Sequence, residues 1–289
     1  MKRTDIVMTE ELKSFLAFDL GHMKEDAFPN KRTDIPYCDD PELLMDIYYP
    51  EEKKDNYPVF LIVFGGGWIS GFRRSRFVEY MLKPLQMGYA CAVAQYTLSL
   101  DDTFPRPVID LKKAVNYLHT HAQELLLDTD NLTLWGESAG GHLALETALL
   151  PNERLGLTGL NTAVKNLVIF YPITDCDTID RYVKTEKDRH LRPDSVMGIF
   201  LASGLNDPQT LDLASPAHWI HPGMPRLWLQ HGTADRLVTP HQSVELAEKM
   251  RRKCPDVPFV YELKEGKEHA DPYFFSMENV KRFIRFIEE

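Results

Sequence analysis

The chain is poor in cysteine, has no cluster of basic residues and contains no long apolar run. Its four cysteines show no Cys-x-x-Cys pair and no histidine at metal-ligand spacing, so the patterns of a zinc site or a redox dithiol are missing. A formal charge of −10 without a Lys/Arg patch argues against a nucleic-acid binder. No window resembles a membrane span, and acidic residues interrupt the N-terminus before any apolar core of signal-peptide length. The simplest interpretation is a cytoplasmic, reduced protein.

Strand and helix patterns alternate along the chain and predict an α/β fold. Continuously apolar, β-rich runs at 59–64, 89–96 and 167–171 are typical of strands buried on both faces. Apolar residues recur at helical spacing over 76–86, 110–121, 241–252 and 279–287. The alternation implies a mostly parallel sheet with helices on both faces, within one domain of residues 1–289.

Two segments fall outside this alternation. Residues 1–40 are polar and mixed, and we expect an N-terminal cap or extension in which Phe15, Leu16, Phe18 and Leu20 form a short helix. Residues 173–225 lack a clear strand, and we expect a lid-like insert at the carboxyl ends of the strands. The alternative is a surface excursion with no role in binding.

The most informative motif is Gly136-Glu-Ser-Ala-Gly140, which lies between an apolar run at 132–135 and a helical segment at 142–150. A strand, a sharp turn at a serine and a helix form a nucleophile elbow, which lifts the serine hydroxyl to the top of a sheet. The two glycines have a steric reason, because a side chain at either place would collide with the strand or the helix. A plain glycine-rich turn is the alternative.

A serine nucleophile needs a base, and the base needs an orienting acid. Asp235 follows the predicted strand at 227–231, and His269 precedes the C-terminal helix. Both lie on loops at the sheet edge that carries Ser138, in the chain order serine, acid, histidine. Asp235 could instead cap a helix, and His269 could be a surface residue. His231 is a rival base and Asp207 a rival acid, while His142 and Asp271 lie close in sequence to Ser138 and His269.

Acyl transfer also needs backbone N–H groups aimed at the developing oxyanion. Gly65-Gly66-Gly67-Trp68 follows the buried strand at 59–64, and glycines let a backbone approach a substrate closely. The N–H of Ala139, at the start of the helix, would supply another donor. A phosphate cradle is the alternative, but the loop lacks a following Gly-Lys-Ser/Thr.

Together these motifs resemble the α/β-hydrolase family, in particular its esterase/lipase branch related to hormone-sensitive lipase and small bacterial carboxylesterases. The match runs from about Asp46 to the C-terminus and includes the segment at 214–216. The resemblance implies a triad of Ser138, Asp235 and His269, oxyanion donors at Gly66, Gly67 and Ala139, and no metal or organic cofactor. The family usually has histidine before the three glycines, whereas this chain has Phe64.

The sequence therefore predicts a serine carboxylic-ester hydrolase that acts on small acyl or aryl esters through an acyl-enzyme. Trp68, Met197 and Phe200 are expected to wall the substrate pocket. An amidase or peptidase of the same fold is one alternative, and a catalytically silent binding protein, which only Phe64 favours, is another. We expect a small-molecule ester as the partner, with no nucleic acid, metal or membrane span; a homodimer stays open.

Overall fold

The computed structural model describes residues 9, 12–13, 16–17, 20–182 and 190–289, and within them one mixed sheet organises the chain. The sheet has eight strands in the order β1-β2-β4-β3-β5-β6-β7-β8. Its strands are β1 Lys31–Pro36, β2 Leu44–Tyr48, β3 Tyr57–Val63, β4 Ala90–Ala94, β5 Leu127–Glu137, β6 Asn166–Phe170, β7 Arg226–Gly232 and β8 Phe259–Lys264. β2 runs antiparallel to both β1 and β4, and the remaining pairs are parallel. Most strands therefore end at the same edge of the sheet.

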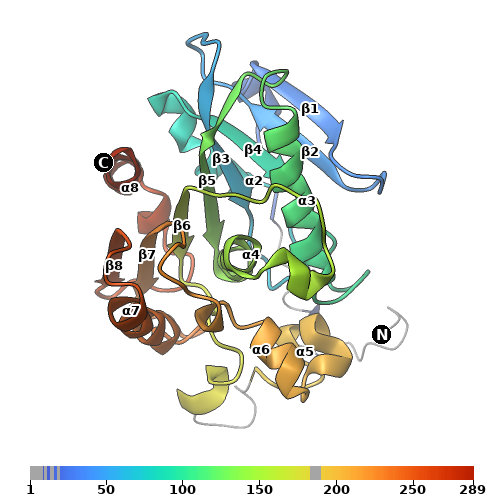
Figure 1. Cartoon of the computed structure of the whole chain (residues 1–289), viewed down its shortest axis with the longest axis vertical. Coiled ribbons are helices and arrows are strands. Elements are labelled where there is room, and N and C mark those ends of the chain that lie inside the picture. The colour runs from blue at the N-terminus through green and yellow to red at the C-terminus, as the bar shows by residue number, and fades with distance from the viewer. Residues whose placement is uncertain (1–8, 10–11, 14–15, 18–19, 183–189) are drawn as a thin grey trace.

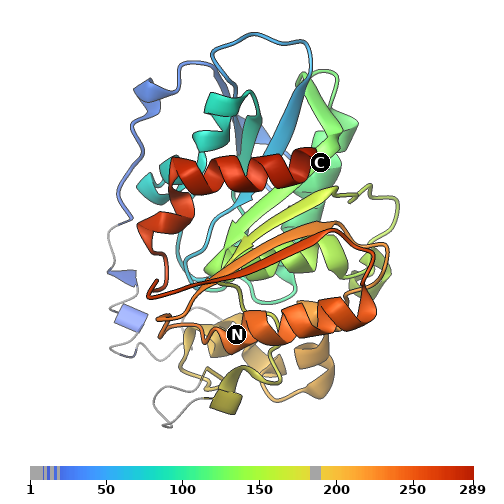
Figure 2. The same ribbon diagram turned by 90° about the vertical axis from the view of Figure 1, so that its left-hand side faces the viewer.

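Helices follow most of the parallel strands and cover both faces of the sheet (Figure 1). They are α2 Arg76–Met81, α3 Arg106–Thr120, α4 Ser138–Leu149, α5 Val196–Leu201, α6 Pro208–Leu213, α7 His241–Lys253 and α8 Met277–Glu288. Short 3₁₀ turns are η2 Glu25–Ala27, η3 Lys83–Met87, η4 Asn152–Leu155, η5 Ile179–Tyr182, η7 Ala202–Gly204, η8 Pro216–His218 and η9 Pro272–Phe275. Figure 2 shows α8 crossing one face of the sheet. No described helix is long and apolar enough to cross a membrane.

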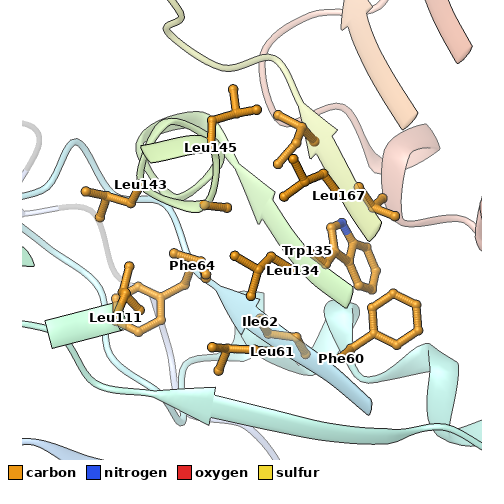
Figure 3. Close-up of a cluster of buried hydrophobic side chains, with 14 of the residues drawn as sticks. Phe60, Leu61, Ile62, Phe64, Leu111, Leu134, Trp135, Leu143, Leu145 and Leu167 are labelled. Atoms are coloured by element: carbon orange, nitrogen blue, oxygen red, sulfur yellow. The ribbon is translucent and has the colours of Figure 1, made fainter. Parts of the chain in front are cut away.

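The core lies on both faces of the central strands because β3 and β5 are buried on both sides. On one face, Phe283 of α8 contacts Phe60 and Trp135, with ring centroids 6.0 and 5.0 Å apart. On the other face, α4 packs beside α3, and Leu134 and Leu143 are fully buried (Figure 3). This double burial explains the continuous apolar runs of the sequence and holds the ends of β3 and β5 firmly in place.

The predicted α/β fold is confirmed, and the differences have local causes. The expected helix over 76–86 is divided into α2 and η3, because Pro84 cannot continue the hydrogen bonding of an α-helix. β1 falls within the segment expected to be a cap, where its alternating half-buried and exposed residues left no apolar run. The insert contains α5 and α6, which Figure 1 shows grouped below α4. Of the expected N-terminal helix, Phe15 and Phe18 lie outside the described residues.

Candidate active site

Ser138 lies at a sharp turn between β5 and α4. Its φ is +52°, a left-handed conformation that is strained for a residue with a side chain. A Cβ added to Gly136 would overlap the carbonyl of Gly140, and one added to Gly140 would overlap the carbonyl of Val63. Both glycines are thus required by the close approach of strand and helix, as the sequence predicts, and the turn places the serine at the N-terminus of α4.

His269 connects Ser138 with Asp235. Its Nε2 is 2.8 Å from Ser138 Oγ, and its Nδ1 is 2.7 Å from Asp235 Oδ2. The carboxylate can only accept, so Nδ1 carries the proton and donates it, which leaves Nε2 to accept the hydrogen bond from the serine hydroxyl. The three side chains come from loops after β5, β7 and β8, and the parallel strand order brings them together.

The Asp235 carboxylate accepts three hydrogen bonds and has one further close contact. Oδ1 accepts from the backbone N–H groups of Leu237 and Val238, each at 2.9 Å. Oδ2 accepts from His269 and lies 3.2 Å from Nε2 of His231. Burial alone would raise the pKa of Asp235, but its contacts with His231 and His269 hold it well below the usual range. The acid is therefore ionised and fixed in orientation.

The rival groups have other partners. His231 is fully buried, and its Nδ1 lies 2.7 Å from Ser243 Oγ while its Nε2 lies 3.0 Å from the Val238 carbonyl. The carboxylate of Asp207 caps α6 by accepting from the Thr210 N–H, and Asp271 accepts from the Tyr273 N–H at the start of η9. Neither of these two acids forms a described bond with His269, so Asp235 is the acid that its ring contacts.

His142 forms part of a buried pair with Trp68. Trp68 Nε1 donates to His142 Nδ1 at 3.3 Å, and His142 Nε2 donates to the carbonyl of Ala214 at 2.9 Å. Burial lowers the pKa of His142 to about 4, so the ring is neutral near pH 7. This histidine therefore links α4 to the glycine loop and to the insert.

The glycine loop, residues 64–68, turns over the end of β3 beside Ser138. Gly66 and Gly67 have φ values of +119° and +58°, which the absence of a side chain permits. The Gly65 N–H donates to Glu137 Oε1, and the Tyr96 hydroxyl donates to the Phe64 carbonyl at 2.9 Å. The Phe64 ring stacks on Tyr96 with centroids 4.6 Å apart. Phe64 therefore supports the loop by packing and through its carbonyl.

A cavity of about 590 Å³ opens beside Ser138 and His269, and its wall is mainly apolar. Besides the elbow and the glycine loop, four parts of the chain form its wall. They are the N-terminal segment, residues 70–77, the loop between β7 and α7, and the loop that carries His269. These contributions are Leu20, Ser70, Gly71, Ser75, Phe77, Leu237 and Ala270. Glu137 and His269 are its only ionisable lining groups among the described residues. Such a cavity suits a small, uncharged group.

The structure does not bring Trp68, Met197 and Phe200 to this cavity. All three are fully or almost fully buried, and the Trp68 ring stacks on Phe200 with centroids 4.5 Å apart. The Trp68 and Phe200 rings also contact His142 of α4, so these two side chains join the glycine loop to α4 and α5. No described residue of 173–225 lines the cavity, whereas Leu20 of the N-terminal segment does.

One group of described residues could offer ligand atoms to a metal: Asp175, Asp177 and His218. It lies outside the cavity, and Lys249 Nζ is already 3.1 Å from Asp175 Oδ2. The His218 imidazole lies 3.4 Å from the same oxygen. These contacts make the group an ion-pair cluster that ties the insert to α7.

Sequence reasoning missed Glu137, Tyr96 and most of the cavity wall. Glu137 lies inside the elbow motif, so its place beside the nucleophile was a signal that could have been used. Tyr96 follows β4 and contacts Phe64 across the sheet edge, 32 residues away. No local pattern in the sequence indicates that contact.

Comparison with known proteins first defines the class. A truncated carbohydrate esterase from gut microbiota superposes with a TM-score of 0.78 at 20% identity, covering 92% of this chain and 98% of that one. The fold is that of the α/β-hydrolases, and the chain falls in their esterase/lipase branch. The BD-FAE family model matches residues 45–250, so the chain belongs to the BD-FAE family.

Two curated relatives differ in chemistry. The probable carboxylic ester hydrolase LipM of Mycobacterium tuberculosis is 27% identical over 221 residues, which are 74% of this chain but only 49% of LipM. The chain thus spans about half the length of this relative. Kynurenine formamidase of Drosophila melanogaster is 22% identical over 253 residues, covering 85% of this chain and 78% of that enzyme.

Proposed function

We propose that the protein is a serine carboxylic-ester hydrolase for small, uncharged acyl or aryl esters. The observation that carries this proposal is the hydrogen-bonded series Ser138–His269–Asp235 at the wall of an apolar cavity. Family membership and the relative named as an ester hydrolase support the same chemistry.

The chemistry begins at the Ser138 hydroxyl, which attacks the ester carbonyl while His269 Nε2 takes its proton. Asp235 holds the ring in the required tautomer and stabilises the imidazolium. The N–H groups of Ala139, Gly66 and Gly67 stabilise the oxyanion of the tetrahedral intermediate. His269 then protonates the leaving alkoxide, and the acyl group remains on Ser138.

Water completes the turnover. His269 takes a proton from a water molecule, whose oxygen attacks the acyl carbonyl, and a second tetrahedral intermediate forms on the same donors. When it collapses, the carboxylic acid leaves and Ser138 regains its proton from His269. The apolar wall formed by Leu20, Phe77 and Leu237 favours uncharged groups, because an anionic group would lose its hydration with no cation to replace it.

The test is a panel of nitrophenyl esters that vary in acyl length and charge. We expect measurable turnover of short neutral esters, weak turnover of a succinyl ester, and a loss of about 1,000-fold or more in kcat for Ser138→Ala. Turnover that survives Ser138→Ala would overturn the proposal. Failure of a fluorophosphonate to label folded protein would favour a binding protein instead.

Amide hydrolysis is the second candidate, because the formamidase of Drosophila melanogaster matches over most of its length. A formyl group is small enough for the cavity, and the same serine, base and oxyanion donors serve an amide. Matched substrates separate the two: an aryl formate ester and the corresponding formanilide. A higher kcat/KM for the anilide would assign the protein to amide hydrolysis.

A further inference from the structure

At its far end the glycine loop is held by the Trp68 side chain, which donates to His142. At its near end Phe64 has no polar side-chain atom, so the polar contacts there involve the backbone of residues 64 and 65. The Tyr96 hydroxyl binds the Phe64 carbonyl, and the Glu137 carboxyl binds the Gly65 N–H. A Cβ on Gly65 would overlap that carboxyl, so a side chain here would have to displace the acid.

Glu137 is a buried acid directly before the nucleophile candidate. It ends β5 directly before Ser138, is only 4% exposed and lines the cavity. No Lys, Arg or His is among the described groups that act on its pKa, although an isolated carboxylate is costly to bury. Burial raises the pKa of Glu137 to about 8, and the hydrogen bond from Gly65 offsets part of the rise.

The Tyr171 hydroxyl, like the Gly65 N–H, lowers the pKa of Glu137 and offsets part of the effect of burial, so burial alone favours the neutral carboxyl. Tyr171, at the end of β6, and Tyr96, after β4, are both buried and have pKa values raised well above the usual range by burial, so both stay uncharged. On the cavity side lie the Ser138 hydroxyl and the His269 ring, and α4 begins with Ser138 itself. None of these groups places a permanent positive charge against the acid.

We propose that Glu137 is a positioning residue of the acyl-transfer reaction, whose neutral carboxyl holds the Gly65 amide and thereby fixes the glycine loop opposite Ser138. The inference rests on the proposed function and adds a regulatory consequence. When Glu137 loses its proton, a negative charge appears in the mainly apolar wall of the cavity where the oxyanion must form. The two charges repel each other, so the rate falls at alkaline pH.

Two variants and one control test this role through the pH profile of kcat on a neutral nitrophenyl ester. Glu137→Gln keeps an oxygen that can accept from Gly65 but cannot ionise; Glu137→Ala removes the support. We expect wild-type kcat to decline above about pH 8, in line with the raised pKa of Glu137. This decline should be absent in Glu137→Gln. At pH 7, Glu137→Ala should lose about 10- to 100-fold in kcat with a KM change below about threefold, and Gln should recover most of that loss.

Glu146→Gln is the matched control. Glu146 lies on α4, is also a buried acid with a raised pKa, and does not line the cavity. It should keep both the rate at pH 7 and the alkaline decline. A wild-type kcat in Glu137→Ala, or an alkaline decline that persists in Glu137→Gln, would overturn the role. If Glu137→Ala does not fold, the Glu137→Gln profile still decides. If the wild type shows no turnover that depends on Ser138, the proposed function itself is refuted.

Discussion

Replacing Asp235 with Asn is expected to disable the base while leaving the fold intact. Asn has one acceptor oxygen, whereas four N–H groups lie around the carboxylate: those of Leu237, Val238, His269 and His231. If its oxygen faces Leu237 and Val238, whose backbone donors are fixed, its NH₂ group faces the two histidine rings. The opposite orientation leaves both backbone N–H groups against a donor, at about 1–3 kcal/mol each. The first orientation is therefore favoured.

In that orientation the His269 ring must change its tautomer. Nδ1 accepts from the Asn amide, so the proton moves to Nε2, which faces the Ser138 hydroxyl and can no longer take a proton from it. Loss of the correct tautomer costs about 1,000- to 10,000-fold in kcat in serine hydrolases of this type. That loss equals about 4–5.5 kcal/mol in the activation barrier.

The assay is steady-state hydrolysis of a short nitrophenyl ester, with circular dichroism to check the fold. Asp207→Asn is the matched control, because Asp207 is an acid of the same size that caps α6 and does not contact His269. Asp207→Asn should retain kcat within about twofold, since the Asn oxygen can still accept from the Thr210 N–H and Asn is as good an N-cap as Asp. A loss below about tenfold in Asp235→Asn would refute the tautomer argument.

Two further predictions concern buried polar contacts. Tyr96→Phe removes the donor to the Phe64 carbonyl and should lower the free energy of unfolding in urea by about 1–2 kcal/mol, with a several-fold loss in kcat; unchanged stability would show that the bond is dispensable. Burial lowers the pKa of His142 from 6.5 to about 4. Between these two pH values the unfolded chain therefore binds a proton that the folded chain excludes. The free energy of unfolding should therefore fall by up to about 3 kcal/mol as the pH drops from 6.5 to about 4. His142→Gln, whose amide can replace both ring contacts, should weaken that dependence, and an equal slope in both proteins would contradict the assignment.

Local sequence patterns predicted the parts of the site that short segments define. The elbow could be read from residues 132–150, because the turn, its two glycines and the helix start are neighbours in sequence. The places of Asp235 and His269 followed from strand order, since loops after parallel strands meet at one sheet edge. Strand bounds were close for the same reason: a strand buried on both faces leaves a continuous apolar run.

The cavity wall depends on long-range packing and was not predictable from such patterns. Trp68 follows the glycine loop and was expected to face substrate, but the stack with Phe200 covers its ring. Leu20 and Leu237 come from segments more than 200 residues apart, and only the folded chain places both beside Ser138. Phe64 stands where the family usually has histidine, and the contacts of Tyr96 and Glu137 that hold the loop at this place come from the segment after β4 and from β5 and were not visible in the local sequence.

The most direct test of the central claim is to trap the acyl group on Ser138. Folded protein is mixed with a slowly hydrolysed nitrophenyl ester, quenched in acid within milliseconds to seconds, and digested for peptide mass spectrometry. A burst of one nitrophenol per chain and an acyl mass on the peptide that contains Ser138 are expected, and both should vanish in Ser138→Ala. Steady turnover with no acylated serine, or an acyl group on another residue, would contradict the account.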